Sequence, residues 1–375
     1  MKQPVIWRII LLLAATVILS ACGGNTSQQP TASQPITIQP TASQPKANVE
    51  GTVWVADEEG NSITVIDAAT NQVLTTLTGI EGAHNLQVAP DGKTVWAVSG
   101  HDSLAVLIDA VTYEVYGVVP TGSMPAHIVL SPDGKKAYVT NGADNTVTVI
   151  DVETRMSTAN IPVGEYPHGL RPSPDGRWVF VANAKSTTLS VIDTQSDTLV
   201  ADIEVGESPV QVGFSPDGQV VYFSLNAENA LGKVDVAKGS LVGKVSVGGG
   251  PVQVFVTPDN KYVLVANQGT QDNPSTSVSI VDVATFTVVA TIETGKGAHG
   301  VVIDPSGRYA YITNIFENTV SVIDIEQQAV IATIPSGSAP NGISFSTLPA
   351  VPAPSTRIQL EIPEVGQMDM PGMTP

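Results

Sequence analysis

The sequence of 375 residues contains one cysteine, Cys22, and this scarcity excludes an intramolecular disulfide and a cysteine-based metal cluster. Charged residues make up only 14%, and Asp and Glu outnumber Lys and Arg by 35 to 17. This acidic balance argues against nucleic acid as a partner and against an anionic lipid surface as the main one. No stretch carries apolar residues at helical spacing for long enough to predict a helix, so the chain is expected to be all-β.

Most catalytic signatures are also missing. The chain has no HExxH zinc motif, no GxSxG nucleophile motif, no P-loop and no CxxCH haem attachment site. Residues 295–300 match the pattern GxGxxG, but that loop holds a pyrophosphate only between a strand and a helix. Here it joins two expected strands. The sequence therefore favours a binding protein over an enzyme.

The N-terminus predicts export and a lipid anchor. Lys2 and Arg8 precede an apolar run at residues 9–18, which is too short to span a membrane. The run ends in Leu-Ser-Ala-Cys22, which matches the lipobox of bacterial lipoproteins. We interpret residues 1–21 as a signal peptide and Cys22 as a lipidated terminus that anchors the chain to a membrane of the cell envelope. Gly23 in place of Asp favours the outer membrane in a Gram-negative host, and the alternatives are the periplasm or the cell surface.

Two segments have compositions that favour disorder. Residues 22–50 are rich in Pro, Ser, Thr and Gln, which is typical of an extended tether. Residues 347–375 are rich in Pro and Met, and their last nine residues contain Met368, Met370 and Met373. Thioether sulfur prefers Cu(I), so this tail is a candidate copper site.

Between these segments the chain repeats itself. An acidic residue closes a Val-Ile-Asp-like segment seven times, with spacings of 42, 42, 42, 42, 47 and 42, at Asp67, Asp109, Asp151, Asp193, Asp235, Asp282 and Asp324. A turn sequence runs in step with this series, as in Pro132-Asp-Gly134. The 47-residue unit has five extra residues within 268–277. The period identifies one structural unit used seven times.

Each unit contains four short runs that alternate apolar with polar or small residues, the pattern of half-buried strands. Four antiparallel strands repeated seven times predict a seven-bladed β-propeller over residues 51–346. The array opens with Val53–Ala56 and ends with Asn341–Ser346, so we expect the two ends to complete one blade. We also expect each Asp after Val-Ile to accept backbone N–H groups in a turn.

The repeat resembles a known family. Tyr138-Val-Thr-Asn141, preceded by Pro132-Asp-Gly134 and followed by Thr146-Val-Thr-Val-Ile-Asp151, is similar to the YVTN β-propeller repeats. This resemblance implies a surface-layer or envelope protein. The repeat is also similar in style to the haem d1 propeller of cytochrome cd1 nitrite reductase and to lactonase-type propellers. Such a likeness is specific for fold and says little about activity.

The histidines provide the candidate site. His84, His168 and His299 share one position at the start of the expected innermost strands, where another unit has Asn341. The next position holds His127, Gln211 and Gln253. In a regular strand, the offset by one residue would turn His127 to the opposite face. These side chains could bind an organic ligand or a transition metal at one mouth of the central channel, or serve only as polar caps.

The sequence leaves three functions open. The first is an envelope-anchored binding or scaffold module for a protein or a small ligand. The second is a lipoprotein that handles copper or another transition metal through the channel histidines or the methionine tail. The third is an enzyme, lactonase-like or using a haem cofactor, although no carboxylate lies beside the channel histidines in the sequence.

Overall fold

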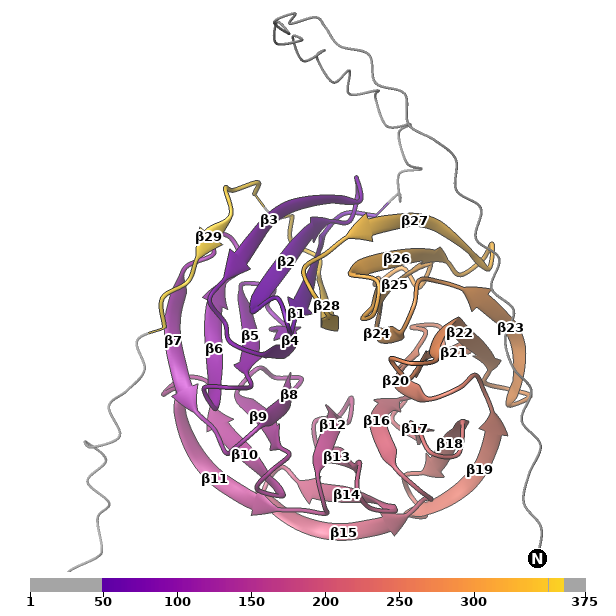
Figure 1. Ribbon diagram of the computed structural model, residues 1–375. Coiled ribbons are helices and arrows are strands. Elements are labelled where there is room, and N and C mark those ends of the chain that lie inside the picture. Colours follow the sequence, from indigo (N-terminus) through magenta and orange to yellow (C-terminus); the bar gives the residue numbers. More distant parts are fainter. Residues whose placement is uncertain (1–48, 350, 361–375) are drawn as a thin grey trace, which may run out of the picture. The chain divides into compact units, whose positions relative to one another are not determined.

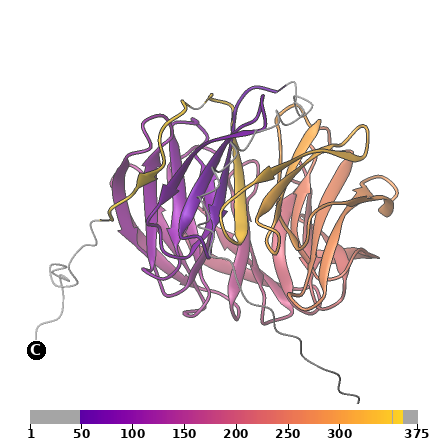
Figure 2. The ribbon, with the colours of Figure 1, turned by 45° about the horizontal axis from the view of Figure 1, so that its top comes forward.

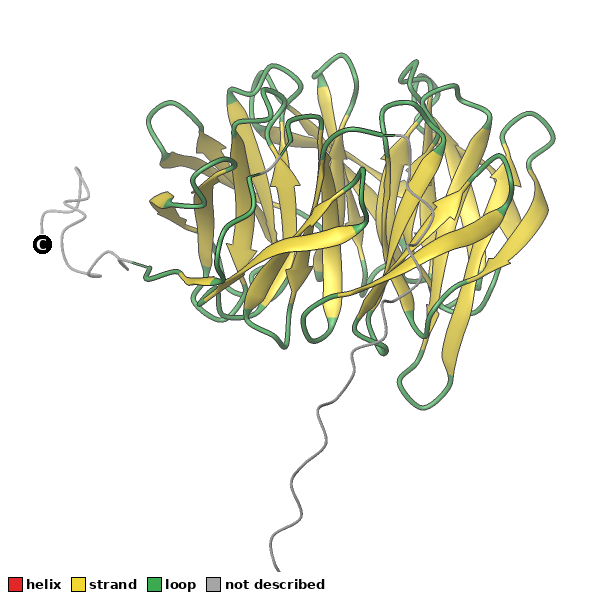
Figure 3. Cartoon of the chain, turned by 90° about the horizontal axis from the view of Figure 1, so that it is seen from above, coloured by secondary structure: helices red, strands yellow, loops and turns green. Residues whose placement is uncertain are grey.

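The computed structural model describes residues 49–349 and 351–360, which form 29 β-strands and contain no helix (Figure 3). Within these residues no helix of the length and apolarity needed to cross a membrane is found. The expected signal peptide, the lipidated Cys22, most of the tether and the three tail methionines lie outside the described residues.

The strands form seven sheets, each with four antiparallel strands, arranged as blades around a central axis (Figure 1). The innermost strands are β4 (Ala83–Val88), β8 (Pro125–Leu130), β12 (Pro167–Pro172), β16 (Pro209–Phe214), β20 (Pro251–Val256), β24 (Ala298–Ile303) and β28 (Pro340–Ser346). The second strands are β1 (Thr52–Asp57), β5 (Thr94–Ser99), β9 (Lys136–Asn141), β13 (Trp178–Asn183), β17 (Val220–Leu225), β21 (Tyr262–Gly269) and β25 (Tyr309–Asn314). The third strands are β2 (Ser62–Asp67), β6 (Leu104–Asp109), β10 (Thr146–Asp151), β14 (Thr188–Asp193), β18 (Ala230–Asp235), β22 (Pro274–Asp282) and β26 (Thr319–Asp324). The outer strands are β3 (Gln72–Thr78), β7 (Val115–Pro120), β11 (Met156–Pro162), β15 (Thr198–Glu204), β19 (Ser240–Ser246), β23 (Thr287–Glu293) and β27 (Ala329–Pro335).

The ring closes by joining the two ends of the repeat array in one blade. β28 pairs with β1, which continues to β2 and β3, with Val53 opposite Phe345. Figure 2 shows β28 standing beside β1 in this blade. Each innermost strand contacts the next around the whole ring, including β28 against β4. The prediction of an all-β, seven-bladed propeller with both ends in one blade is confirmed.

The core lies between neighbouring blades. Trp54 of the first blade is fully buried in the same apolar cluster as Leu86 and Val95 of the next blade. Burial of a side chain of this kind stabilises the fold by about 2 kcal/mol, and the pattern recurs at the other blade interfaces.

The repeated residues have structural roles. The Asp that closes each third strand accepts a backbone N–H from the following turn, as expected from the sequence. Asn141 on β9 donates its side-chain N–H groups to the hydroxyls of Thr146 and Thr148, at 3.0 and 2.8 Å, and its Oδ1 accepts the N–H of Gly122. A Cβ on Gly122 would lie 2.7 Å from the Asn141 carboxamide, which explains why a glycine stands there.

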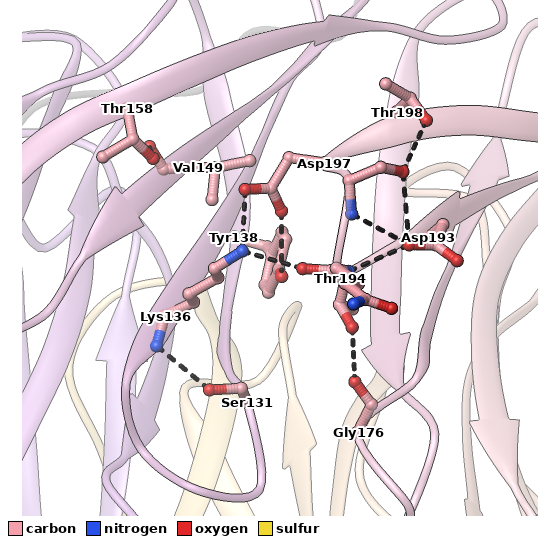
Figure 4. A network of polar contacts seen from close by, with 12 residues as sticks. Ser131, Lys136, Tyr138, Val149, Thr158, Gly176, Asp193, Thr194, Asp197 and Thr198 are labelled. Atoms are coloured by element: carbon pink, nitrogen blue, oxygen red, sulfur yellow. Dashed lines mark hydrogen bonds and ion pairs between the residues drawn. The ribbon is translucent and has the colours of Figure 1, made fainter.

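Some contacts between blades use residues that vary among the copies. Lys136 on β9 reaches the next blade, where its Nζ donates to Asp197 Oδ2 and to the Thr194 carbonyl, each at 2.7 Å (Figure 4). The ion pair is only partly buried, with side-chain exposures of 32% and 19%, so its contribution to stability is modest.

The chain stays against the propeller beyond Ser346, where the sequence analysis placed its end. A short strand, β29 (Thr356–Arg357), pairs in parallel with β3 and makes that sheet five-stranded. Ile358 is buried in the cluster of the first two blades, and the Tyr113 hydroxyl donates to the Val351 carbonyl at 2.7 Å. Residues 351–360 therefore act as a strap across the outer edges of these blades.

Candidate functional site

Each innermost strand has a bulge near its start, where two successive residues oppose a single residue of the second strand. In β4, Ala83 pairs with Ser99 and Leu86 with Ala97, so His84 and Asn85 together oppose a single residue of β5. The same shift of register occurs in the other six blades. A bulge of this kind redirects the side chain of the extra residue. The strand is therefore not regular at His127, and the ring of this residue lies 5.6 Å from that of His84 and 4.6 Å from that of His168, between centroids.

Three of the channel histidines form one cluster, which we call the histidine centre: His84 on β4, His127 on β8 and His168 on β12. Their potential ligand nitrogens all lie within 4.8 Å of one another. The ring centroids of His127 and His168 are 4.6 Å apart, and the Nε2 atoms of His84 and His168 are 3.2 Å apart. Three neighbouring blades thus contribute one imidazole each.

Glu58 contacts His84 at Nδ1, the ring nitrogen that does not face His168. Its Oε1 lies 3.1 Å from His84 Nδ1, and its Oε2 accepts an N–H of Asn341 at 2.8 Å. Burial alone would raise the pKa of Glu58, but its interactions with His84 and the hydrogen bond from Asn341 outweigh it and lower the pKa to about 2. Glu58 is therefore an ionised hydrogen-bond acceptor and a weak base.

The other two imidazoles are also oriented by their surroundings. His168 Nδ1 donates to the Val210 carbonyl at 3.2 Å, which leaves its Nε2 directed at His84. His127 Nδ1 lies 3.4 Å from the Gln211 side-chain nitrogen, and its fully buried Nε2 has no hydrogen-bond partner among the described residues. An unsatisfied buried nitrogen is costly, so it marks a place where a ligand would be stabilising.

Burial keeps the inner histidines neutral. It lowers the pKa of His168 and of His299 to about 3, and that of His127 well below its usual value, with a smaller contribution from neighbouring imidazoles. Neutral imidazole is the form that binds metals.

Two candidates from the sequence lie apart from the histidine centre. His299 is buried, and neither of its ring nitrogens forms a well-aligned hydrogen bond within the described part of the chain. Asn341 donates an N–H to Glu58 Oε2, and its side-chain nitrogen lies 3.1 Å from His84 Nδ1. Gln253 accepts the Val301 N–H at 3.3 Å and supports the next blade.

A cavity of about 910 Å³ lies beside Glu58, formed by the loops that join second to third strands and outer to innermost strands. We call it the mouth cavity. Lys296 and Phe316 line it, as do Gln271 and Pro274 from the five-residue insertion. Farther along β12, burial lowers the pKa of Arg171 to about 10, and among the described residues its guanidinium has the Leu170 carbonyl as its one hydrogen-bond partner, at 3.4 Å.

Sequence reasoning missed Glu58. The residue that follows the second strand is Gly100, Gly142 or Ala184 in three other blades, and no other blade has an acidic residue there. An alignment of the seven copies at this position would have identified Glu58 as the exception. Its contact with His84 could not be inferred, because the two residues come from different blades.

Comparison with solved structures supports the fold. A chain of Kuenenia stuttgartiensis hydrazine synthase is 24% identical, with a TM-score of 0.65 over 71% of this chain and 90% of that one. The putative 6-phosphogluconolactonase of Bacteroides fragilis is 17% identical, with a TM-score of 0.67 over 80% and 98%. Dihydro-heme d1 dehydrogenase NirN, solved in complex with DHE, is 16% identical, with a TM-score of 0.60 over 82% and 78%. At these identities the likeness concerns the fold alone.

No curated protein matches the sequence. The model of one family, described as YNCE-like β-propeller, matches residues 94–349, which is more than half of the chain. This match agrees with the YVTN-type repeat of the sequence. The chain belongs to the YNCE-like β-propeller family.

Proposed function

We propose that this chain is an exported, lipid-anchored propeller that binds a transition-metal ion at the histidine centre. Of the functions that the sequence left open, this one draws on the largest number of specific contacts. The binding module and the metal-handling lipoprotein then become one proposal, in which the bound ligand is a metal ion.

The observation that carries the proposal is the separation of 3.2 Å between the Nε2 atoms of His84 and His168. Two imidazole nitrogens bound to one tetrahedral metal ion at about 2.0–2.1 Å lie about 3.3 Å apart. A direct hydrogen bond between the two nitrogens requires a proton, and a metal cation can take its place. His127 supplies the third nitrogen within 4.8 Å.

The outer contacts are those that metal-binding histidines commonly make. Such histidines donate their second ring N–H to a carboxylate or a backbone carbonyl, which fixes the tautomer and the ring orientation. Glu58 has this position for His84, and the Val210 carbonyl has it for His168. For His127, ligation through Nε2 places a proton on Nδ1, the ring nitrogen that faces the Gln211 carboxamide.

The ligand set favours an ion of the borderline class. Three neutral imidazoles suit Zn²⁺ and copper, whereas Ca²⁺ and Mg²⁺ prefer oxygen ligands. Three protein ligands also leave a coordination position open, as in zinc sites that bind a further molecule. The methionines at 368, 370 and 373 are a separate proposal for Cu(I), since they lie outside the described residues.

The proposed location follows from the lipobox at residues 19–22. A lipidated Cys22 with a tether of about 30 residues would hold the propeller beside a bacterial envelope membrane without spanning it. Labelling of the expressed protein with radioactive palmitate, with Cys22→Ser as the control, tests this part. Equal labelling of both forms would contradict it.

The metal proposal is tested by titrating chelator-treated protein with Zn²⁺ and Cu²⁺ in a calorimeter. We expect one ion per chain, and a loss of at least about 100-fold in affinity for His84→Ala and for His168→Ala. His101→Ala is the matched control, because His101 lies outside the histidine centre. A chain that ends at residue 366 lacks the three tail methionines, so its titration shows whether they contribute to metal binding. Unchanged binding by the double variant of His84 and His168 would overturn the proposal.

A further inference from the structure

The mouth cavity is joined to the histidine centre by one side chain. Glu58 forms part of the cavity wall, and the same carboxylate lies 3.1 Å from His84 Nδ1. The Glu58 side chain is 37% exposed and that of His84 is 17% exposed. A molecule in the mouth cavity would therefore be separated from a metal ion on His84 Nε2 by the side chains of Glu58 and His84.

The acidic and the basic side chains near the cavity differ in whether they have polar partners. Both acidic residues of the wall already have partners: Glu58 contacts His84 and Asn341, and Glu59 accepts the Ser338 hydroxyl at 3.5 Å. The ammonium group of Lys296 is exposed and forms no hydrogen bond or ion pair with any residue that the structure describes. Arg171, which also lacks a carboxylate partner in the described chain, is not among the residues that line the cavity. Lys296 is therefore the cation that an anion in the cavity would contact.

Part of the cavity wall is apolar. Ile315 and Phe316 follow β25, and Pro274 begins β22. Gln271 and Pro274 belong to the five residues by which the sixth repeat exceeds the others. The insertion, which has no role in the repeat fold, thus forms one side of this cavity.

We propose that the mouth cavity binds a small organic anion, a carboxylate with an apolar body, beside the metal ion. The carboxylate faces Lys296, and the apolar body lies against Phe316 and Pro274. This inference rests on the proposed metal centre, because a divalent cation with three neutral ligands adds positive charge next to the cavity and strengthens anion binding.

The test uses benzoate as the anion, with acetate and benzylamine as comparisons, titrated into the zinc-loaded and the metal-free protein. We expect benzoate to bind at least about 10-fold more tightly than acetate, which lacks the apolar body, and than benzylamine, which has the opposite charge. Zinc should increase benzoate affinity. Lys296→Met should lower benzoate affinity at least about 10-fold without changing zinc affinity, and Phe316→Ala should reduce the preference for benzoate over acetate.

Several results would overturn the inference. They are no benzoate binding to either form, tighter binding of benzylamine, or benzoate affinity that is unchanged in both variants. The zinc titration tests the proposed function, and the benzoate titration tests the assignment of the cavity. Absence of zinc binding would contradict the proposed function, whereas zinc binding without any benzoate binding would contradict only the assignment of the cavity.

Discussion

Asp57 stands at the end of β1, where four other blades have an asparagine, and it should destabilise the propeller at neutral pH. Its carboxylate is fully buried and accepts the hydroxyls of Ser62, Thr64 and Ser336 at 3.1, 2.7 and 2.7 Å. Burial raises the pKa of Asp57 from 3.8 to about 6, although these hydrogen bonds act in the opposite direction.

The sign of the effect follows from proton linkage. Because the pKa is higher in the folded state, the folded chain binds the proton more tightly than the unfolded chain. The stabilisation that comes from this tighter proton binding at Asp57 is complete below pH 3.8 and is lost as the pH rises through about 6. A shift of about two pKa units corresponds to about 3 kcal/mol of lost stability at pH 7.

Asp57→Asn removes the charge and gives this blade the residue that four other blades have. We expect the variant to be more stable by about 1–3 kcal/mol at pH 7.5 and nearly equal to the natural chain at pH 4. Urea unfolding followed by tryptophan fluorescence measures both differences. Asn141→Asp is the matched reverse substitution, and it should destabilise at pH 7.5 only. Equal effects of Asp57→Asn at the two pH values, or destabilisation at pH 7.5, would refute the reasoning.

Three further predictions address the site and the fold. Glu58→Gln should weaken zinc binding about 10- to 100-fold, because it removes the charged acceptor of the first imidazole, and isothermal titration would show an unchanged stoichiometry. Gly164→Ala should lower the melting temperature by several degrees, since its Cβ would lie 2.4 Å from Asn183, whereas Gly249→Ala, with no atom within 4 Å, should not. A chain that ends at residue 349 should lose about 2 kcal/mol or more, because it lacks Ile358 and exposes the apolar cluster that this side chain covers, while one that ends at 366 should keep its stability in the same thermal assay.

The sequence predicts the scaffold well because the scaffold is repeated. The series from Asp67 to Asp324 gives the number of blades and the turn chemistry, and Asn341–Ser346 gives the closing strand. Each of these depends on local patterns that recur at a fixed period, so one copy corroborates the next.

The site is less predictable because it is made where the copies differ. His84 and His168 share a repeat position, but His127 joins them only because a bulge changes the strand geometry. Glu58 and Lys296 come from blades that are far apart in the chain, and only ring closure brings them to one cavity. The strap at residues 351–360 matches no part of the repeat, so the sequence offered only its Pro-rich composition, which is typical of disorder.

X-ray absorption spectroscopy of the zinc-loaded full chain tests the central claim most directly, because it reports the ligand atoms around the ion. The histidine centre predicts about three imidazole nitrogens at about 2.0–2.1 Å and one additional light ligand in the open position. The spectrum should lose its imidazole signature in the double variant His84→Ala, His168→Ala. A shell of oxygens alone, a sulfur ligand at about 2.3 Å, or an unchanged spectrum in that variant would contradict the claim.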